Sequence, residues 1–179
     1  MATSGAIFEG KPARRGPRHD VTTRAPAPGD ADGLGRMFSR CSAETILYRF
    51  HLPFPRVPAA MIWRLVNVDP RLGGAIVAEA DGEIVGHAMY IREDEGDREA
   101  EVAVVVEDGR SSGGVGRRLL AEIRQEAARA GIDMLLCTTL GDNLRTQKIA
   151  RRTFPGARIT FSDGMCEMRL PLGQSTNRI

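Results

Sequence analysis

Apolar and polar positions in the middle of the chain follow the patterns of β-strands. Residues 75–80, 83–92 and 99–106 are rich in apolar and β-branched side chains, and Asp81-Gly82 between the first two runs is a turn signal. These three runs predict a meander of antiparallel strands.

Segments whose apolar residues have helical spacing lie before and after this meander in the sequence. Apolar residues recur every three or four positions from Val115 to Ala127, and Gly131 is placed to end that helix. An apolar run at 134–140 then predicts a buried strand, which completes a strand, loop, helix, strand unit. The same signals predict the remaining elements: a strand at 21–24, helices at 31–39, after Ser42, at 59–66 and at 143–153, and strands at 157–162 and 165–170.

This order of elements predicts the fold class α/β (α+β), with a mixed, mostly antiparallel central sheet of about six to seven strands flanked by about four helices. The expected domain is residues 21–172. Residues 1–20 and 173–179 are expected to be tails, because the first segment has too few apolar residues to offset the entropy of ordering. An RNA-binding or membrane-surface arm at 11–18 is the less favoured alternative, since this basic run is short and lacks aromatic residues.

Composition narrows the class of protein. The net charge of +2 is the difference between 25 basic and 23 acidic side chains, so we expect no nucleic-acid partner. No apolar run is long enough to cross a bilayer, so we expect no membrane partner. Cys41, Cys137 and Cys166 are too widely spaced for a disulfide framework or a zinc site, which favours a reducing, cytoplasmic location and no metal.

A glycine-rich loop joins the third strand of the meander to the helix after it. The stretch 110–116 reads Arg-Ser-Ser-Gly-Gly-Val-Gly, so several backbone N–H groups can point into one concavity at the positive end of the helix dipole. A diphosphate suits this geometry best. The loop matches neither the P-loop nor the Rossmann fingerprint, and a tight turn that binds nothing is the alternative. Arg110, Arg117 and Arg118 add nearby positive charge.

These residues resemble the motif of the GNAT superfamily of acetyltransferases, which usually reads Val-x-x-x-x-Gln-x-x-Gly-x-Gly. The spacing from Val106 to Gly114 and Gly116 matches, whereas Ser111 replaces the usual Gln or Arg. The phrase from Ser42 to Phe50 looks like the helix entry in GNAT domains of bacterial Pat-type protein lysine acetyltransferases.

The resemblance implies that acetyl-CoA is the co-substrate, without a metal. The cofactor would lie between the fourth and fifth expected strands, 99–106 and 134–140. Backbone groups of Val104, Val105 and Val106 would then hydrogen-bond the pantetheine arm. Asn143 matches the family asparagine near that arm, and a helix N-cap is its alternative role. The residues implied around the diphosphate are Ser111, Ser112, Gly113, Gly114, Val115, Gly116 and Arg117.

Glu101 is the candidate catalytic base. It is the one carboxylate in the interior of the valine-rich strand, which begins at Glu99, and the family's Pat-type members keep a glutamate in a similar context. Apolar neighbours would raise the pKa of its carboxyl group towards a useful range. The alternative is a carboxylate on a polar face or paired with Arg98 or Arg92. The position of the family's acid tyrosine is Ala150, which leaves either no dedicated acid or another donor such as Tyr90.

We therefore expect an N-acetyltransferase that moves the acetyl group of acetyl-CoA to an amine by direct attack in a ternary complex. The acceptor is a protein lysine or a small-molecule amine, and a homodimer is left open. Two other classes remain as alternatives: a non-catalytic acyl-CoA-binding or sensing domain, and an interaction module whose glycine loop binds nothing.

Overall fold

The computed structural model describes residues 7–9, 20–110 and 114–173. In these residues a single eight-stranded sheet has the order β2-β3-β4-β5-β6-β8-β7, and β1 pairs with β5 outside that path. The strands are β1 (Ile7–Glu9), β2 (Thr22–Arg24), β3 (Gly73–Ala80), β4 (Glu83–Ile91), β5 (Glu99–Val106), β6 (Met134–Leu140), β7 (Arg158–Ser162) and β8 (Met165–Pro171).

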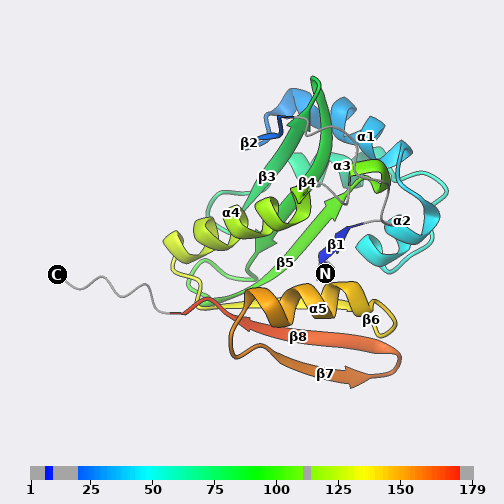
Figure 1. The fold of residues 1–179 in the computed structure, drawn as a ribbon. Helices are drawn as coiled ribbons and strands as arrows, with labels where there is room; N and C mark the ends of the chain where they lie inside the picture. The colour runs from blue at the N-terminus through cyan, green and yellow to red at the C-terminus, as the bar shows by residue number, and fades with distance from the viewer. Residues whose placement is uncertain (1–6, 10–19, 111–113, 174–179) are drawn as a thin grey trace.

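Five α-helices cover the sheet in the described part of the chain (Figure 1). They are α1 (Ala31–Ser39), α2 (Ala43–Phe50), α3 (Ala59–Val66), α4 (Val115–Arg129) and α5 (Leu144–Thr153). One hydrophobic cluster packs α4 and α5 against the sheet, and the other packs α1, α2 and α3 against it. The sheet is therefore the middle layer of three.

Side chains of β5 alternate between these two clusters, as the two-residue period of a strand requires. Val102, Val104 and Val106 belong to the cluster with α4, whereas Ala103 and Val105 face α1 to α3. Because both faces are covered, β5 reads in the sequence as a nearly continuous apolar run. Glu101 lies in the α1 to α3 half of this alternation, two residues before Ala103.

Most strand pairs are antiparallel, and the parallel exceptions both involve β5. Strand β6 pairs in parallel with β5 only from Glu99 to Glu101 and continues beyond that point paired with β8 alone. On its other side β5 stays paired with β4 from Glu101 to Val106. The edge of β5 that β6 leaves is paired over Val104 to Val106 by β1.

The α/β fold and its mixed, mostly antiparallel sheet are confirmed. The five α-helices of the described residues are the five helical segments predicted one by one, and the sheet has eight strands, one more than the upper end of the expected range of six to seven. The additional strand, β1, lies within residues 1–20, which we expected to be a tail. Three residues are too few to show a periodic pattern, and their pairing depends on an edge contributed by residues almost a hundred positions away.

Candidate active site

The glycine loop begins in a short 3-10 turn, Asp108–Arg110, and ends at Gly114. Gly114 is the N-cap of α4 and has φ 83°, a left-handed conformation that favours glycine. Val115 and Gly116 follow as buried residues of the first helical turn. The backbone N–H groups of that turn lack helical acceptors, which suits an anionic ligand. Three predicted contacts, Ser111, Ser112 and Gly113, lie outside the described residues.

The basic residues around this loop have different surroundings. Arg110 pairs with Asp81, with Nη2 2.6 Å from Oδ2. Arg118 pairs with Glu122, with Nε 2.9 Å from Oε1. Arg117 is exposed, and its Nη2 lies 3.7 Å from where a Cβ on Gly114 would be. Of the three arginines singled out in the sequence, Arg117 is thus the one that lies directly over the N-terminus of α4.

Hydrogen bonds fix the end of β5 to the first helices. Asp108 accepts from the backbone N–H of Ser42 at 2.6 Å and from Oγ1 of Thr45 at 2.8 Å. Arg40 donates through Nε to Oε2 of Glu107 at 2.6 Å. The Ser42 side chain also accepts from the N–H of Thr45 and caps α2. The helix-entry phrase noted in the sequence therefore anchors α2 to the segment that leads into the glycine loop.

Val104, Val105 and Val106, the predicted pantetheine contacts, are fully buried. One edge of this stretch is paired with β4, and the other edge is paired with Ile7–Glu9. The resemblance assigns the backbone of Val104 to Val106 to the cofactor arm. Because β4 pairs with one edge of this stretch, the arm could bind only along the other edge, where β1 lies.

Glu101 stands at the last residue pair of β5 and β6, opposite Leu136. Its side chain is half-buried, and Oε2 is buried without a hydrogen-bond partner. Arg98 is engaged with Asp133, and Arg92 donates to the carbonyl of Arg71, so neither makes the ion pair considered as an alternative. Burial raises the pKa of the Glu101 carboxyl group, and the charge of Arg49 partly opposes that shift.

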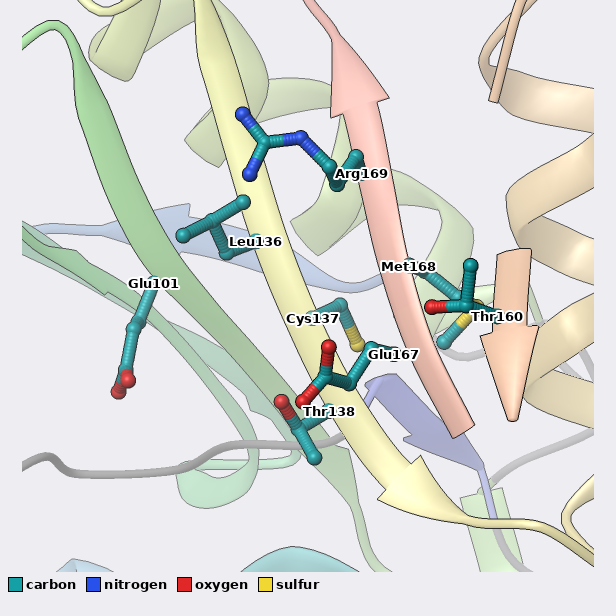
Figure 2. A pocket seen from close by; sticks show the side chains of 8 residues that line it. All are labelled: Glu101, Leu136, Cys137, Thr138, Thr160, Glu167, Met168 and Arg169. Carbon is teal, nitrogen blue, oxygen red and sulfur yellow. The ribbon is translucent and has the colours of Figure 1, made fainter. Parts of the chain in front are cut away.

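A pocket opens beside Glu101 where β6 separates from β5 (Figure 2). Glu101 projects from β5 on one side, and Glu167 on β8 supplies a second carboxylate on the other. The residues that complete the lining are Leu136, Cys137 and Thr138 of β6, Thr160 of β7, and Met168 and Arg169 of β8. No three His, Cys, Asp or Glu side chains in the described ranges gather as a metal site requires.

Arg49 on α2 is a charged residue without exposed surface. Its Nη2 lies 3.5 Å from Sδ of Met89, and its guanidinium lies 4.9 Å from the ring centre of Phe50. Nε and Nη1 are buried without partners, and burial lowers the pKa of Arg49 to about 10. Arg49 was given no role from the sequence, and the structure places it with Thr45 and Ile46 on the buried face of α2.

The charge of Arg49 acts on Glu101, His51 and His87. Each of these three residues has one buried side-chain atom without a hydrogen-bond partner. His87 is fully buried, and its Nε2 lies 3.1 Å from the carbonyl oxygen of Leu65, which requires the Nε2–H tautomer. Burial, assisted by Arg49, lowers the pKa of His87 to about 3, so its ring is neutral at pH 7.

Two further candidates from the sequence lie in the core. Asn143 is 2% exposed and caps α5, because its Oδ1 accepts from the N–H of Thr146 at 3.1 Å. Its Nδ2 donates to Oγ1 of Thr139 at 3.0 Å, so the N-cap alternative is realised, and a contact with the cofactor arm stays a prediction. Tyr90 is 3% exposed and packs in the cluster with α4, as expected for a structural residue.

A splayed strand pair, a helix N-terminus at its wide end and a desolvated carboxylate at its base form the arrangement that the resemblance implies for an acyl-CoA-dependent acyltransferase. The model of the Acetyltransferase (GNAT) family matches residues 42–154, more than half of the chain. The chain belongs to this family and is a GNAT-family N-acetyltransferase.

Solved structures share this fold. The GNAT domain of S. lividans PAT has a TM-score of 0.78 and 27% identity, over 84% of this chain and 90% of that one. The yncA protein from Salmonella typhimurium, solved with its cofactor acetyl-CoA, has a TM-score of 0.68 and 19% identity, over 87% and 96% of the two chains. The ribosomal-protein-S18-alanine N-acetyltransferase from Escherichia coli has a TM-score of 0.67 and 16% identity, over 89% and 99%.

A search of curated proteins finds no match to this sequence. Within the described residues, no helix combines the length and apolar character needed to span a membrane.

Proposed function

We propose that this protein transfers an acetyl group from acetyl-CoA to an amine by direct attack in a ternary complex, with Glu101 as the general base. The observation that carries the proposal is the position of Glu101. Glu101 stands where β5 and β6 separate, at the base of the cleft that the cofactor arm would enter, and its buried Oε2 has no hydrogen-bond partner.

The cofactor would lie along β5, with its diphosphate at the N-terminus of α4. N–H groups of Gly114, Val115 and Gly116, together with the Arg117 side chain, would bind the diphosphate, as would Ser111, Ser112 and Gly113. The arm would run along Val104 to Val106, with Asn143 nearby. This path leads from the helix N-terminus back towards Glu101, so the thioester and the carboxylate would meet in the splay.

Starting from its ammonium form, the acceptor nitrogen loses two protons on the way to the amide, one before it attacks and one after. An ammonium group is not nucleophilic, so Glu101 accepts its proton directly or through one water molecule. The free amine then attacks the thioester carbonyl, a C–N bond forms and the C–S bond breaks. The CoA thiolate leaves with the electron pair of the C–S bond, and it takes up the second proton, which the attacking nitrogen loses as the amide forms. A carboxylate whose pKa is raised by burial is a better proton acceptor than a fully solvated one.

A protein lysine is the acceptor we favour. The support is the phrase Ser42 to Phe50 and the likeness to the GNAT domain of S. lividans PAT. Three free cysteines, Cys41, Cys137 and Cys166, fit a reducing compartment such as the cytoplasm, where protein lysines are available.

Cofactor binding and turnover can be tested separately. Acetyl-CoA at about 100 times its dissociation constant should stabilise the protein by roughly 2.7 kcal/mol in thermal unfolding. Gly114→Val should abolish this stabilisation because the N-cap glycine has a left-handed φ, whereas Glu101→Gln should retain it and lose turnover. Release of CoA thiol is then measured with lysine peptides and with small amines.

Each result decides between classes of function. Stabilisation by acetyl-CoA together with release of CoA thiol in the presence of lysine peptides supports the proposal. Release of CoA thiol with small amines alone would show that the acceptor is a small amine and not a protein lysine. Stabilisation without turnover on any amine indicates a sensing domain. The absence of stabilisation and of turnover indicates an interaction module.

A further inference from the structure

A short strand near the start of the chain, β1, pairs with the backbone edge of β5 that forms part of the candidate cofactor site. Residues Ile7, Phe8 and Glu9 of β1 stand in parallel register with Val104, Val105 and Val106 of β5. Strand β1 also contacts α2, α4 and α5, so it lies between the two helical layers, as Figure 1 shows for the short strand next to β5. The segment therefore occupies the wide end of the splay between β5 and β6.

This edge of β5 is the one that an extended ligand can use. The opposite edge is paired with β4 over the whole stretch from Glu101 to Val106. Strand β6 pairs with β5 no further than Glu101. N–H and C=O groups of the edge beyond Glu101 can therefore accept a strand or a strand-like ligand, but each group can serve only one of them at a time.

We propose that β1 is an intramolecular competitor of acyl-CoA: residues 7–9 and the amide-bearing arm of the cofactor use the same backbone edge, 104–106, and exclude each other. This inference rests on the proposed function, since it assumes that the cofactor arm lies along β5. Binding of acyl-CoA then releases β1, and pairing of β1 lowers the apparent affinity for acyl-CoA.

The size of the effect follows from the fraction of molecules in which the edge is free. The apparent dissociation constant equals the intrinsic constant divided by that fraction. If β1 is paired in about 90% of molecules, removing the pairing strengthens CoA binding about tenfold. A three-residue strand is short enough to be released by a ligand that makes several hydrogen bonds of its own.

Proline substitutions in the full chain test the competition. Proline has no N–H and is excluded from the interior of a strand ladder, so the double variant Ile7→Pro/Phe8→Pro removes the pairing whichever of the two residues donates. Calorimetric titration with CoA should give a dissociation constant about tenfold lower than that of the unchanged protein. Ala13→Pro, the same type of substitution outside β1, should leave the constant unchanged. A synthetic peptide of residues 1–12 should weaken CoA binding to the double variant competitively.

Hydrogen exchange adds a direct readout on the unchanged protein. The amides of residues 7–9 should exchange faster when CoA is bound, because β1 leaves the sheet. Equal CoA affinity of the unchanged protein and the double variant would overturn the competition while leaving the cofactor site in place. Slower exchange at residues 7–9 with CoA would overturn it as well. Failure of both proteins to bind CoA would instead overturn the proposed function on which the inference rests.

Discussion

Oδ2 of Asp108 lies 2.6 Å from the backbone nitrogen of Ser42 and accepts its N–H. This bond joins the end of β5 to the start of α2, two segments separated by 66 positions in the chain. Asp108 also accepts from Oγ1 of Thr45, and a carboxylate at a helix N-terminus is favoured by the helix dipole. The helix that carries Arg49 is thus fixed directly to the entrance of the glycine loop.

Replacement of Asp108 by Ala should lower the free energy of unfolding by about 1–3 kcal/mol, because it removes an N-terminal acceptor and leaves partly buried donors without partners. Urea unfolding at pH 7 measures the loss. Asp133→Ala is a matched control, since Asp133 makes an exposed ion pair with Arg98. A loss no larger than that of the control would show that the bonds to Ser42 and Thr45 do not stabilise the fold.

Element boundaries were predictable from local signals. Ser42 marks the start of α2 as an N-cap, and Gly131 stands two residues after the end of α4. The bond between Asp108 and Ser42 was not predictable, because it depends on tertiary packing that no local pattern encodes. The same holds for β1, whose pairing partner is contributed by β5.

The glycine loop and the N-cap at Asn143 were predictable from local composition, whereas a single polar residue in an apolar element was recognised in only one of two cases. Glu101 interrupts an apolar strand and was recognised as a candidate base. Arg49 interrupts the apolar face of α2 and was not given a role, because the face of so short a helix becomes evident only when its buried side is known. The electrostatic interaction between Arg49 and Glu101 could be recognised only in the three-dimensional structure.

Replacement of Glu101 by Gln should lower kcat by roughly 100- to 10,000-fold, the usual contribution of a general base. The side chain is nearly isosteric but cannot accept the proton of the ammonium. In the unchanged protein kcat/KM should fall as pH decreases through the pKa of Glu101, which burial raises above its ordinary value. This acidic limb should be absent in the variant.

Release of CoA thiol at saturating acetyl-CoA across a pH series measures both quantities. Glu99→Gln is the control, since Glu99 lies two residues away on the same strand and pairs with Arg169 at the surface. Turnover of Glu101→Gln equal to that of the control at every pH would exclude Glu101 as the base.

Replacement of Arg49 by Met should move the acidic limb of kcat/KM to higher pH. The positive charge of Arg49 lowers the pKa of Glu101, so its removal leaves the effect of burial unopposed. Stability should not decrease with it, because a buried guanidinium whose Nε and Nη1 lack hydrogen-bond partners is unfavourable and an apolar side chain of similar length fills the space.

The matched variant for this test is Arg49→Lys, which keeps a positive charge on α2. Its acidic limb should lie closer to that of the unchanged protein than the limb of Arg49→Met does. An identical limb in all three proteins would show that Arg49 does not influence the ionisation of the base. A loss of several kcal/mol in Arg49→Met would show that its guanidinium has stabilising partners.

His87 should make the protein less stable in mild acid. Its pKa is about 3 in the folded state, against an ordinary value of 6.5. Above pH 6.5 neither state binds the proton, so the full stability is present. As pH falls from 6.5 towards 3 the unfolded chain binds a proton that the buried ring cannot, and the free energy of unfolding falls by at most about 1.4 kcal/mol per pH unit.

Comparison with His87→Gln isolates this contribution, because the amide can still donate to the carbonyl of Leu65 but does not titrate. Urea unfolding between pH 7 and pH 5 should show a difference in unfolding free energy that shrinks as pH decreases, since only the unchanged protein loses stability through the histidine. Glu101, whose raised pKa acts in the opposite direction, is present in both proteins and cancels. A difference that stays constant over this range would mean that His87 takes up a proton in the folded state, in which case the space around Arg49 is open to water.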